Sequence, residues 1–187
     1  MKRQKEILVV DDDPSVRTML ARVLAEEGYR VRSAANGAAA LQVANTAPPD
    51  LVLLDLKLPQ ENGWDIFGRL TRKWPLLPVV VITDRPNQLF TALAVGGGAL
   101  LEKPLHIPKM LQTISRLLRE SVETRLARMA GKAAHFDYLP AWPETHASCG
   151  RHRLIPPPAK DRSQRRWGSK HALRHSRPLR KPFRPLR

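Results

Sequence analysis

The stretch ILVVDDDP, residues 7–14, predicts how this 187-residue chain begins to fold. Four consecutive apolar residues are typical of a strand that is buried on both faces, as in a parallel sheet. Three aspartates follow at once, although adjacent carboxylates repel one another. Pro14 suits the first turn of a helix, and Asp13 before it is expected to cap that helix. Asp11 and Asp12 are thereby left as candidates for a site at the end of the strand.

The alternation of a short apolar run with a helical pattern continues outward from this stretch to about residue 130. Such alternation predicts an α/β fold, a doubly wound five-stranded parallel sheet covered by helices on both faces. The last helix carries an apolar stripe and is expected to run to about residue 130. The predicted strands are residues 7–10, 29–33, 51–54, 79–82 and 99–101, and the predicted helices are 14–27, 36–45, 63–74, 87–95 and 107–130.

Five polar residues share a position at the carboxyl end of a predicted strand: Asp11, Asp12, Asp55, Thr83 and Lys103. Ligands bind at this edge of an open α/β sheet. If the first and third strands are neighbours, the three carboxylates converge, which is unfavourable unless a cation such as Mg²⁺ joins them. Lys103 can then neutralise a phosphoryl oxygen, and Thr83 can donate a hydrogen bond to another. An aspartate can serve as the nucleophile in such chemistry.

These motifs resemble the receiver domain of two-component response regulators over about residues 5–125. The resemblance rests on VVDDDPSVR, LVLLDLKLPQENGWD, VVVIT and LEKPL. In the second motif a proline lies four residues after Asp55 and a glycine eight residues after it, as in that family. The resemblance implies a flavodoxin-like (βα)5 fold with strand order 2-1-3-4-5. It also implies a phosphorelay signalling domain rather than a metabolic enzyme, with self-phosphotransfer and autodephosphorylation as its only chemistry.

The resemblance also implies a role for each residue of the strand-end group. Asp55 would be the phosphoacceptor, served by a histidine kinase or phosphotransfer protein, and a downstream protein partner would read the result. The bond before Pro104 would be cis, which an X-Pro bond can adopt at modest cost. Asp11, Asp12 and Asp55 would hold Mg²⁺ with the backbone carbonyl of Lys57, Thr83 would be the switch hydroxyl, and Lys103 would bind the phosphoryl group.

Two positions depart from the family pattern. The residue after the switch hydroxyl is usually small, but here it is Asp84, whose carboxylate would oppose an anionic donor if it pointed inward. Three residues before the lysine the family usually carries Tyr or Phe, whose rotation reports phosphorylation, and here the residue is Leu100. In the family the phosphorylated state rearranges a face built from the fourth helix, fifth strand and fifth helix. Asp84 and Leu100 are therefore expected to modulate the site and its readout.

The end of the chain differs sharply from the rest in net charge and amino-acid composition. Residues 1–125 hold 17 Lys and Arg against 14 Asp and Glu, a net +3, whereas residues 126–187 hold 15 against 3, a net +12. The sequence predicts a receiver domain over residues 1–130 and a basic Pro/Arg-rich tail over 131–187. Apolar residues are sparse there, so the tail is expected to be largely disordered. Its YLPAW stretch, residues 138–142, is a candidate for local docking.

Two other functions remain open. Asp11 to Ser15 read D-x-D-x-S, as in a haloacid-dehalogenase-like phosphatase with Asp11 as nucleophile and Asp13 as acid/base. That family needs a further acidic pair after the lysine, where residues 104–136 offer only Glu120 and Glu123, and the hypothesis leaves Asp55 unexplained. Alternatively the basic tail makes the chain a nucleic-acid-binding adaptor, since charge asymmetry of this kind suits a polyanion.

The single cysteine, Cys149, excludes an internal disulfide framework and fits a reducing compartment, so a cytoplasmic location is expected. The apolar run at residues 7–10 is too short for the core of a signal peptide, and no run approaches the length of a membrane span. We therefore expect no membrane partner.

Overall fold

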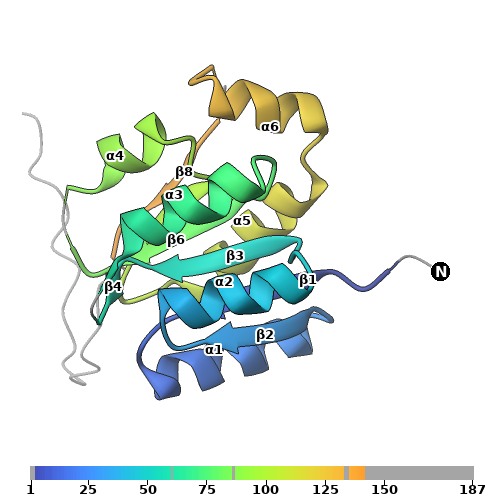
Figure 1. The fold of residues 1–187 in the computed structure, drawn as a ribbon, viewed down its shortest axis with the longest axis vertical. Coiled ribbons are helices and arrows are strands. Elements are labelled where there is room, and N and C mark those ends of the chain that lie inside the picture. The colour runs from blue at the N-terminus through green and yellow to red at the C-terminus, as the bar shows by residue number, and fades with distance from the viewer. Residues whose placement is uncertain (1–2, 60, 86, 133–134, 142–187) are drawn as a thin grey trace, which may run out of the picture. The chain divides into compact units, whose positions relative to one another are not determined.

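A six-stranded parallel sheet forms the centre of the computed structural model, which describes residues 3–59, 61–85, 87–132 and 135–141 (Figure 1). Its first five strands follow the predicted order 2-1-3-4-5, which confirms the doubly wound flavodoxin-like fold. In spatial order the strands are β2 (Arg30–Ala34), β1 (Glu6–Val10), β3 (Leu51–Asp55), β6 (Val79–Thr83), β7 (Ala99–Glu102) and β8 (Asp137–Leu139).

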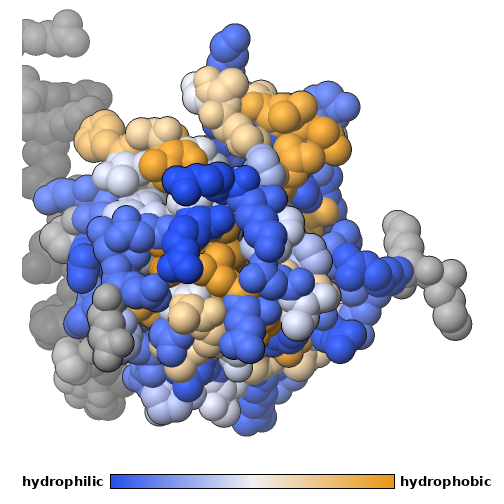
Figure 2. Space-filling view, viewed as in Figure 1, coloured by the Kyte–Doolittle hydropathy of each residue, from blue (hydrophilic) through white to orange (hydrophobic). Residues whose placement is uncertain are grey.

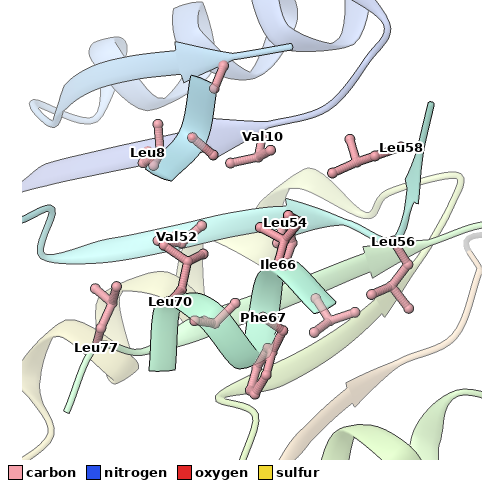
Figure 3. Packing of buried hydrophobic residues seen from close by; sticks show 14 of the residues in the cluster. Leu8, Val10, Val52, Leu54, Leu56, Leu58, Ile66, Phe67, Leu70 and Leu77 are labelled. Atoms are coloured by element: carbon pink, nitrogen blue, oxygen red, sulfur yellow. The ribbon is translucent and has the colours of Figure 1, made fainter. Parts of the chain in front are cut away.

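Helices cover both faces of the sheet because alternate strand residues point to opposite sides. In β1, Ile7 and Val9 face one core, which α1 (Pro14–Glu26) and α5 (Ile107–Arg119) complete. Leu8 and Val10 face the second core, shown in Figure 3. That core is completed by α2 (Gly37–Thr46), α3 (Gly63–Lys73) and α4 (Leu89–Ala94), and a short antiparallel pair, β4 (Lys57–Leu58) with β5 (Glu61–Asn62), leads into α3.

The prediction of one long last helix is wrong, because the helix is interrupted after Arg119. A separate helix, α6, spans Val122–Met129. The backbone of Glu120 is extended, with ψ 137°, and the Ser121 side chain accepts a hydrogen bond from the Thr124 N–H at 3.2 Å. A serine cap satisfies the amide groups at the start of α6 and so favours a new helix over continuation of α5.

The sixth strand corrects the predicted strand count. β8 lies after residue 130, in the region assigned to the tail, and it pairs in parallel with β7. Residues 135–141, here called the strap, include most of the YLPAW stretch. Phe136 packs against the core that contains Leu8, whereas Leu139 packs against the core that contains Ile7. Residues 142–187 lie outside the described residues, so the predicted disorder of the tail stays a prediction.

Exposed apolar side chains gather over α4 and α6, and Figure 2 shows those of α6 in orange. Phe90 of α4 is 82% exposed, and Ala92 is the one residue of that helix that is fully buried. Few buried apolar contacts hold α4 to the sheet, which gives this helix low local stability.

No helix in the described part of the chain is both long enough and apolar enough to cross a membrane.

Candidate functional site

Three carboxylates meet at the carboxyl edge of the sheet. Asp11 follows β1 and Asp55 ends β3, and these strands are hydrogen-bonded neighbours with Val10 opposite Leu54. The two acids therefore occupy equivalent positions on adjacent strands. Asp11 is 1% exposed and Asp55 is 3% exposed, whereas Asp12 is open to solvent. Among the described residues, the three form a group whose candidate ligand oxygens lie within 4.8 Å of one another.

Lys103 supplies the positive charge that this acidic group needs in the resting protein. Its Nζ donates to Asp11 Oδ2 at 2.8 Å and to Asp55 Oδ2 at 2.6 Å. Burial disfavours the ammonium form, but the hydrogen bonds to both carboxylates outweigh it and raise the pKa of Lys103. Lys103 directly follows β7, and the bond to Pro104 is cis, as the resemblance implied.

The Asp55 carboxyl is harder to ionise than an ordinary aspartate. Burial is the main cause of its raised pKa, and the nearby Asp11 charge adds to it, while Lys103 and the Lys57 N–H act in the opposite direction. Burial removes water from the carboxylate and so penalises its charged form. The negative charge of Asp55 is therefore energetically unfavourable in the folded state, and a bound divalent cation would offset this cost.

Replacing Asp55 with Asn should therefore raise the free energy of unfolding at pH 7 in the absence of divalent cations. A carboxyl whose pKa is raised by folding binds its proton more tightly in the folded state. The parent protein consequently gains stability as the pH falls through this raised pKa toward the ordinary aspartate pKa of 3.8, whereas Asp55→Asn lacks this gain.

Urea unfolding at pH 7 and pH 4.5 checks this expectation. The stability difference between variant and parent should narrow at the lower pH, and adding Mg²⁺ at pH 7 should narrow it too. Asp65→Asn is the matched control, because Asp65 is an exposed aspartate of α3 that lies outside the acidic group. An Asp55→Asn variant less stable than its parent at pH 7 would show that its pairing with Lys103 outweighs its burial.

Thr83 ends β6 beside the acidic group and is completely buried. Its Oγ accepts a hydrogen bond from the Arg85 N–H at 2.9 Å, which uses an oxygen lone pair and not the hydroxyl proton. Its backbone carbonyl accepts from the Lys103 N–H at 2.8 Å. The ends of β6 and β7 are thus joined at the two residues expected to contact a phosphoryl group.

The loop after β1 is held by its own polar groups. The Asp13 carboxylate caps α1 by accepting from the Ser15 N–H at 2.7 Å, as the sequence predicted, and this bond lowers the pKa of Asp13. A lowered pKa is the wrong direction for the general acid that the phosphatase alternative requires at this residue. Arg17, which sequence reasoning missed, donates to the carbonyls of Asp11 and Asp12 and so fixes the backbone between them.

Lys57 links the acidic group to Asp84. Its backbone N–H donates to Asp55 Oδ1 at 2.9 Å, which brings the Lys57 backbone against the Asp55 carboxylate. Its side chain extends to Asp84, with 3.0 Å between Nζ and Oδ2, and hydrogen bonding to Lys57 lowers the pKa of Asp84. Asp84 thus has a cationic partner, which no sequence pattern had indicated.

The donor set fits a hard divalent cation. Three carboxylates at one edge of the sheet, two buried and one exposed, offer only oxygen ligands and leave one side open to water or phosphate. Mg²⁺ prefers oxygen ligands of this kind and usually keeps several waters. Asp11, Asp12 and Asp55 are the residues that would hold it, and the carbonyl of Lys57 as a further ligand stays a prediction.

Comparison with known proteins finds the family that the sequence motifs resemble. The sequence model of the response regulator receiver domain matches residues 7–115. The probable transcriptional regulatory protein TcrX of Mycobacterium tuberculosis is 33% identical over 117 residues, which are 62% of this chain and 50% of TcrX. The chain therefore spans about half the length of this curated relative.

Solved structures show the same likeness. A CheY-like response regulator receiver domain protein from Methanospirillum hungatei has 27% sequence identity and a TM-score of 0.59, covering 62% of this chain and 94% of that chain. TrrA, a response regulator protein from Thermotoga maritima crystallised with Mg²⁺ and BeF, has 28% identity and a TM-score of 0.57, covering 61% of this chain and 99% of that chain. None of these three proteins is described as a phosphatase.

Proposed function

The chain belongs to the response regulator receiver domain family of two-component systems, and we propose that it accepts a phosphoryl group on Asp55. The donor would be the phosphohistidine of a histidine kinase or of a phosphotransfer protein. The observation that carries this proposal is the contact of Lys103 Nζ with both Asp55 and Asp11, inside a group of three converging carboxylates. The phosphatase alternative gives Asp55 no role, although Lys103 contacts it as closely as it contacts Asp11.

The transfer is a displacement at phosphorus. One oxygen of Asp55 forms the new O–P bond while the N–P bond to the donor imidazole breaks. The electron pair of that bond stays on the imidazole nitrogen. Positive charge beside the phosphoryl oxygens lowers the barrier because charge spreads over them in the transition state. Mg²⁺ held by Asp11, Asp12 and Asp55 would supply part of that charge.

The chain's own residues supply the rest. Lys103 exchanges its bond with Asp55 for one with a phosphoryl oxygen, and the Thr83 hydroxyl donates a hydrogen bond to another phosphoryl oxygen. Because the Lys103 N–H bonds to the Thr83 carbonyl, these two movements are mechanically linked. The result is a signalling domain whose chemistry ends with hydrolysis of its own acyl phosphate. A cytoplasmic location and a downstream protein partner belong to the same proposal.

The test is to incubate the full chain with Mg²⁺ and acetyl phosphate and to map any acyl phosphate by mass spectrometry. We expect a single modified residue, Asp55. Acyl phosphate on Asp11 would instead support the phosphatase alternative, and no acyl phosphate would overturn the proposal. Binding of nucleic acid through the basic tail stays a separate prediction, supported by the charge of residues 126–187 and by the name of one relative, a transcriptional regulatory protein.

The Lys57–Asp84 pair should change the rate at which small anionic phosphoryl donors label Asp55. Because Lys57 already offsets the carboxylate, Asp84→Asn should accelerate labelling by acetyl phosphate only about 2–5-fold at low salt. Lys57→Met leaves Asp84 without this cation and should slow labelling by a similar factor, while the double variant should return near the parent rate. The measurement is the initial labelling rate at 20 mM and 500 mM NaCl, where high salt should remove most of each effect.

Rates that do not differ among the parent, the two single variants and the double variant would contradict this expectation. They would show that the pair is too exposed to influence the site. Side-chain exposures of 64% for Lys57 and 44% for Asp84 make the pair itself a weak contributor to stability, so the variants should unfold like the parent.

A further inference from the structure

The strap places an aromatic side chain beside the position where the receiver family carries one. Leu100 is fully buried in β7, and its register partner in β8 is Tyr138. Register partners on parallel strands project to the same face of a sheet. Leu100 packs in the core that faces α2, α3 and α4, so Tyr138 projects toward that face too. The missing aromatic of β7 is therefore matched by one on the adjacent strand.

Tyr138 is bonded to the residue that precedes the phosphoryl-binding lysine. Its hydroxyl donates to Glu102 Oε1 at 2.8 Å, and the Ala141 N–H donates to Glu102 Oε2 at 3.3 Å. Glu102 is followed directly by Lys103, whose Nζ contacts Asp55. The strap is therefore hydrogen-bonded to the residue that immediately precedes the lysine in contact with the candidate phosphorylation site.

The other contacts of the strap hold it along β7 and α5. Asp137 accepts from Arg116 of α5, with Nε at 3.0 Å and a terminal nitrogen at 2.7 Å. A groove of about 690 Å³ remains between α5 and the strap, so the strap is held by discrete polar contacts and a few apolar side chains. A three-residue edge strand held in this way has low local stability and can open without unfolding the sheet.

We propose that the strap is the element that reports phosphorylation in this chain, with Tyr138 acting in place of the aromatic missing at position 100. Phosphorylation of Asp55 loosens the strap from β7 and uncovers the face formed by β7 and α5. This inference rests on the proposed function, because it assigns the conformational output of the same site.

The coupling follows from the order of contacts along β7. In this proposal, the change of partner from Asp11 and Asp55 to a phosphoryl oxygen shifts Lys103 and the backbone that it shares with Glu102. The two bonds from the strap fit the resting position of the Glu102 carboxylate. Hydrogen bonds weaken steeply when distance and angle are lost, so movement of Glu102 favours the open strap. In turn, the closed strap favours the unphosphorylated arrangement of the site, in which Lys103 contacts Asp11 and Asp55, because coupling between two equilibria is reciprocal.

Hydrogen–deuterium exchange of the full chain, with and without Mg²⁺ and beryllofluoride as phosphoryl analogue, tests the proposal. Amides near Asp55 should become more protected, and the amides of residues 137–139 and 141 should exchange about fivefold faster or more, the low end of typical coupling. By reciprocity, Tyr138→Phe should bind beryllofluoride about fivefold more tightly than the parent. Tyr29→Phe is the matched control, since it removes the chain's other tyrosine hydroxyl, beside the opposite edge strand β2, and should leave affinity unchanged.

The outcomes separate this inference from the function on which it rests. Protection near Asp55 with unchanged exchange in the strap would overturn the inference and leave the phosphoacceptor function standing. Equal beryllofluoride affinity in Tyr138→Phe and Tyr29→Phe would also overturn it. If no amide near Asp55 responds and no acyl phosphate forms, the proposed function fails and the inference fails with it.

Discussion

Asp55→Asn should abolish acyl phosphate formation in the full chain, the largest effect expected of any single substitution. An amide nitrogen or oxygen cannot replace the carboxylate oxygen that we propose attacks phosphorus, and the neighbouring acids have other partners. Asp13 caps α1, and Asp11 is held by Lys103 and by the Asp13 N–H at 2.9 Å. Labelling with acetyl phosphate and Mg²⁺, followed by mass spectrometry, measures the loss.

Asp13→Asn provides the matched comparison, because asparagine caps a helix as well as aspartate does and the acidic group stays intact. This variant should be labelled at the parent level. Labelling that persists in Asp55→Asn would identify another acceptor, and its position would decide between an alternative receiver site and the phosphatase chemistry proposed for Asp11.

Shortening the chain to residue 130 should lower its free energy of unfolding, whereas shortening it to residue 141 should not. The shorter chain loses β8, the partly buried side chains of Phe136 and Leu139, and one of the two acidic partners of Arg116, since Glu120 remains. Partial burial of two apolar side chains and one ion pair together contribute roughly 2–4 kcal/mol. Urea unfolding of the three chain lengths measures the difference.

Both shortened chains should still fold and accept phosphate at Asp55, because the five predicted strands and α5 remain. Equal stability at both lengths would show that the strap contributes nothing to the fold. A chain ending at residue 130 that does not fold would place the strap in the essential core and move the boundary of the receiver domain past the predicted residue 130.

Five strands and the polar residues at their ends could be predicted because their signals are local and repeated, whereas the strand order followed only from the resemblance to the receiver family. A buried parallel strand requires a run of apolar residues, and ILVV, LVLL and VVVI each supply one. The helices between them follow a 3.6-residue period with clear ends, such as Gly28 at φ +80°. Topology then brings the strand ends together, so that Asp11, Asp55 and Lys103 meet although they lie far apart in sequence.

The sequence by itself determined five of the strands, most of the helices and the polar residues at the strand ends, since each depends on patterns that a short window contains. Only the tertiary structure decided the strap, the break before α6 and the pairing of Lys57 with Asp84. A three-residue strand such as β8 is too short to show a period, and its place depends on the free edge of β7 and on Arg116 of α5. An ion pair between exposed residues leaves no pattern in sequence, because it depends on how two loops approach one another in space.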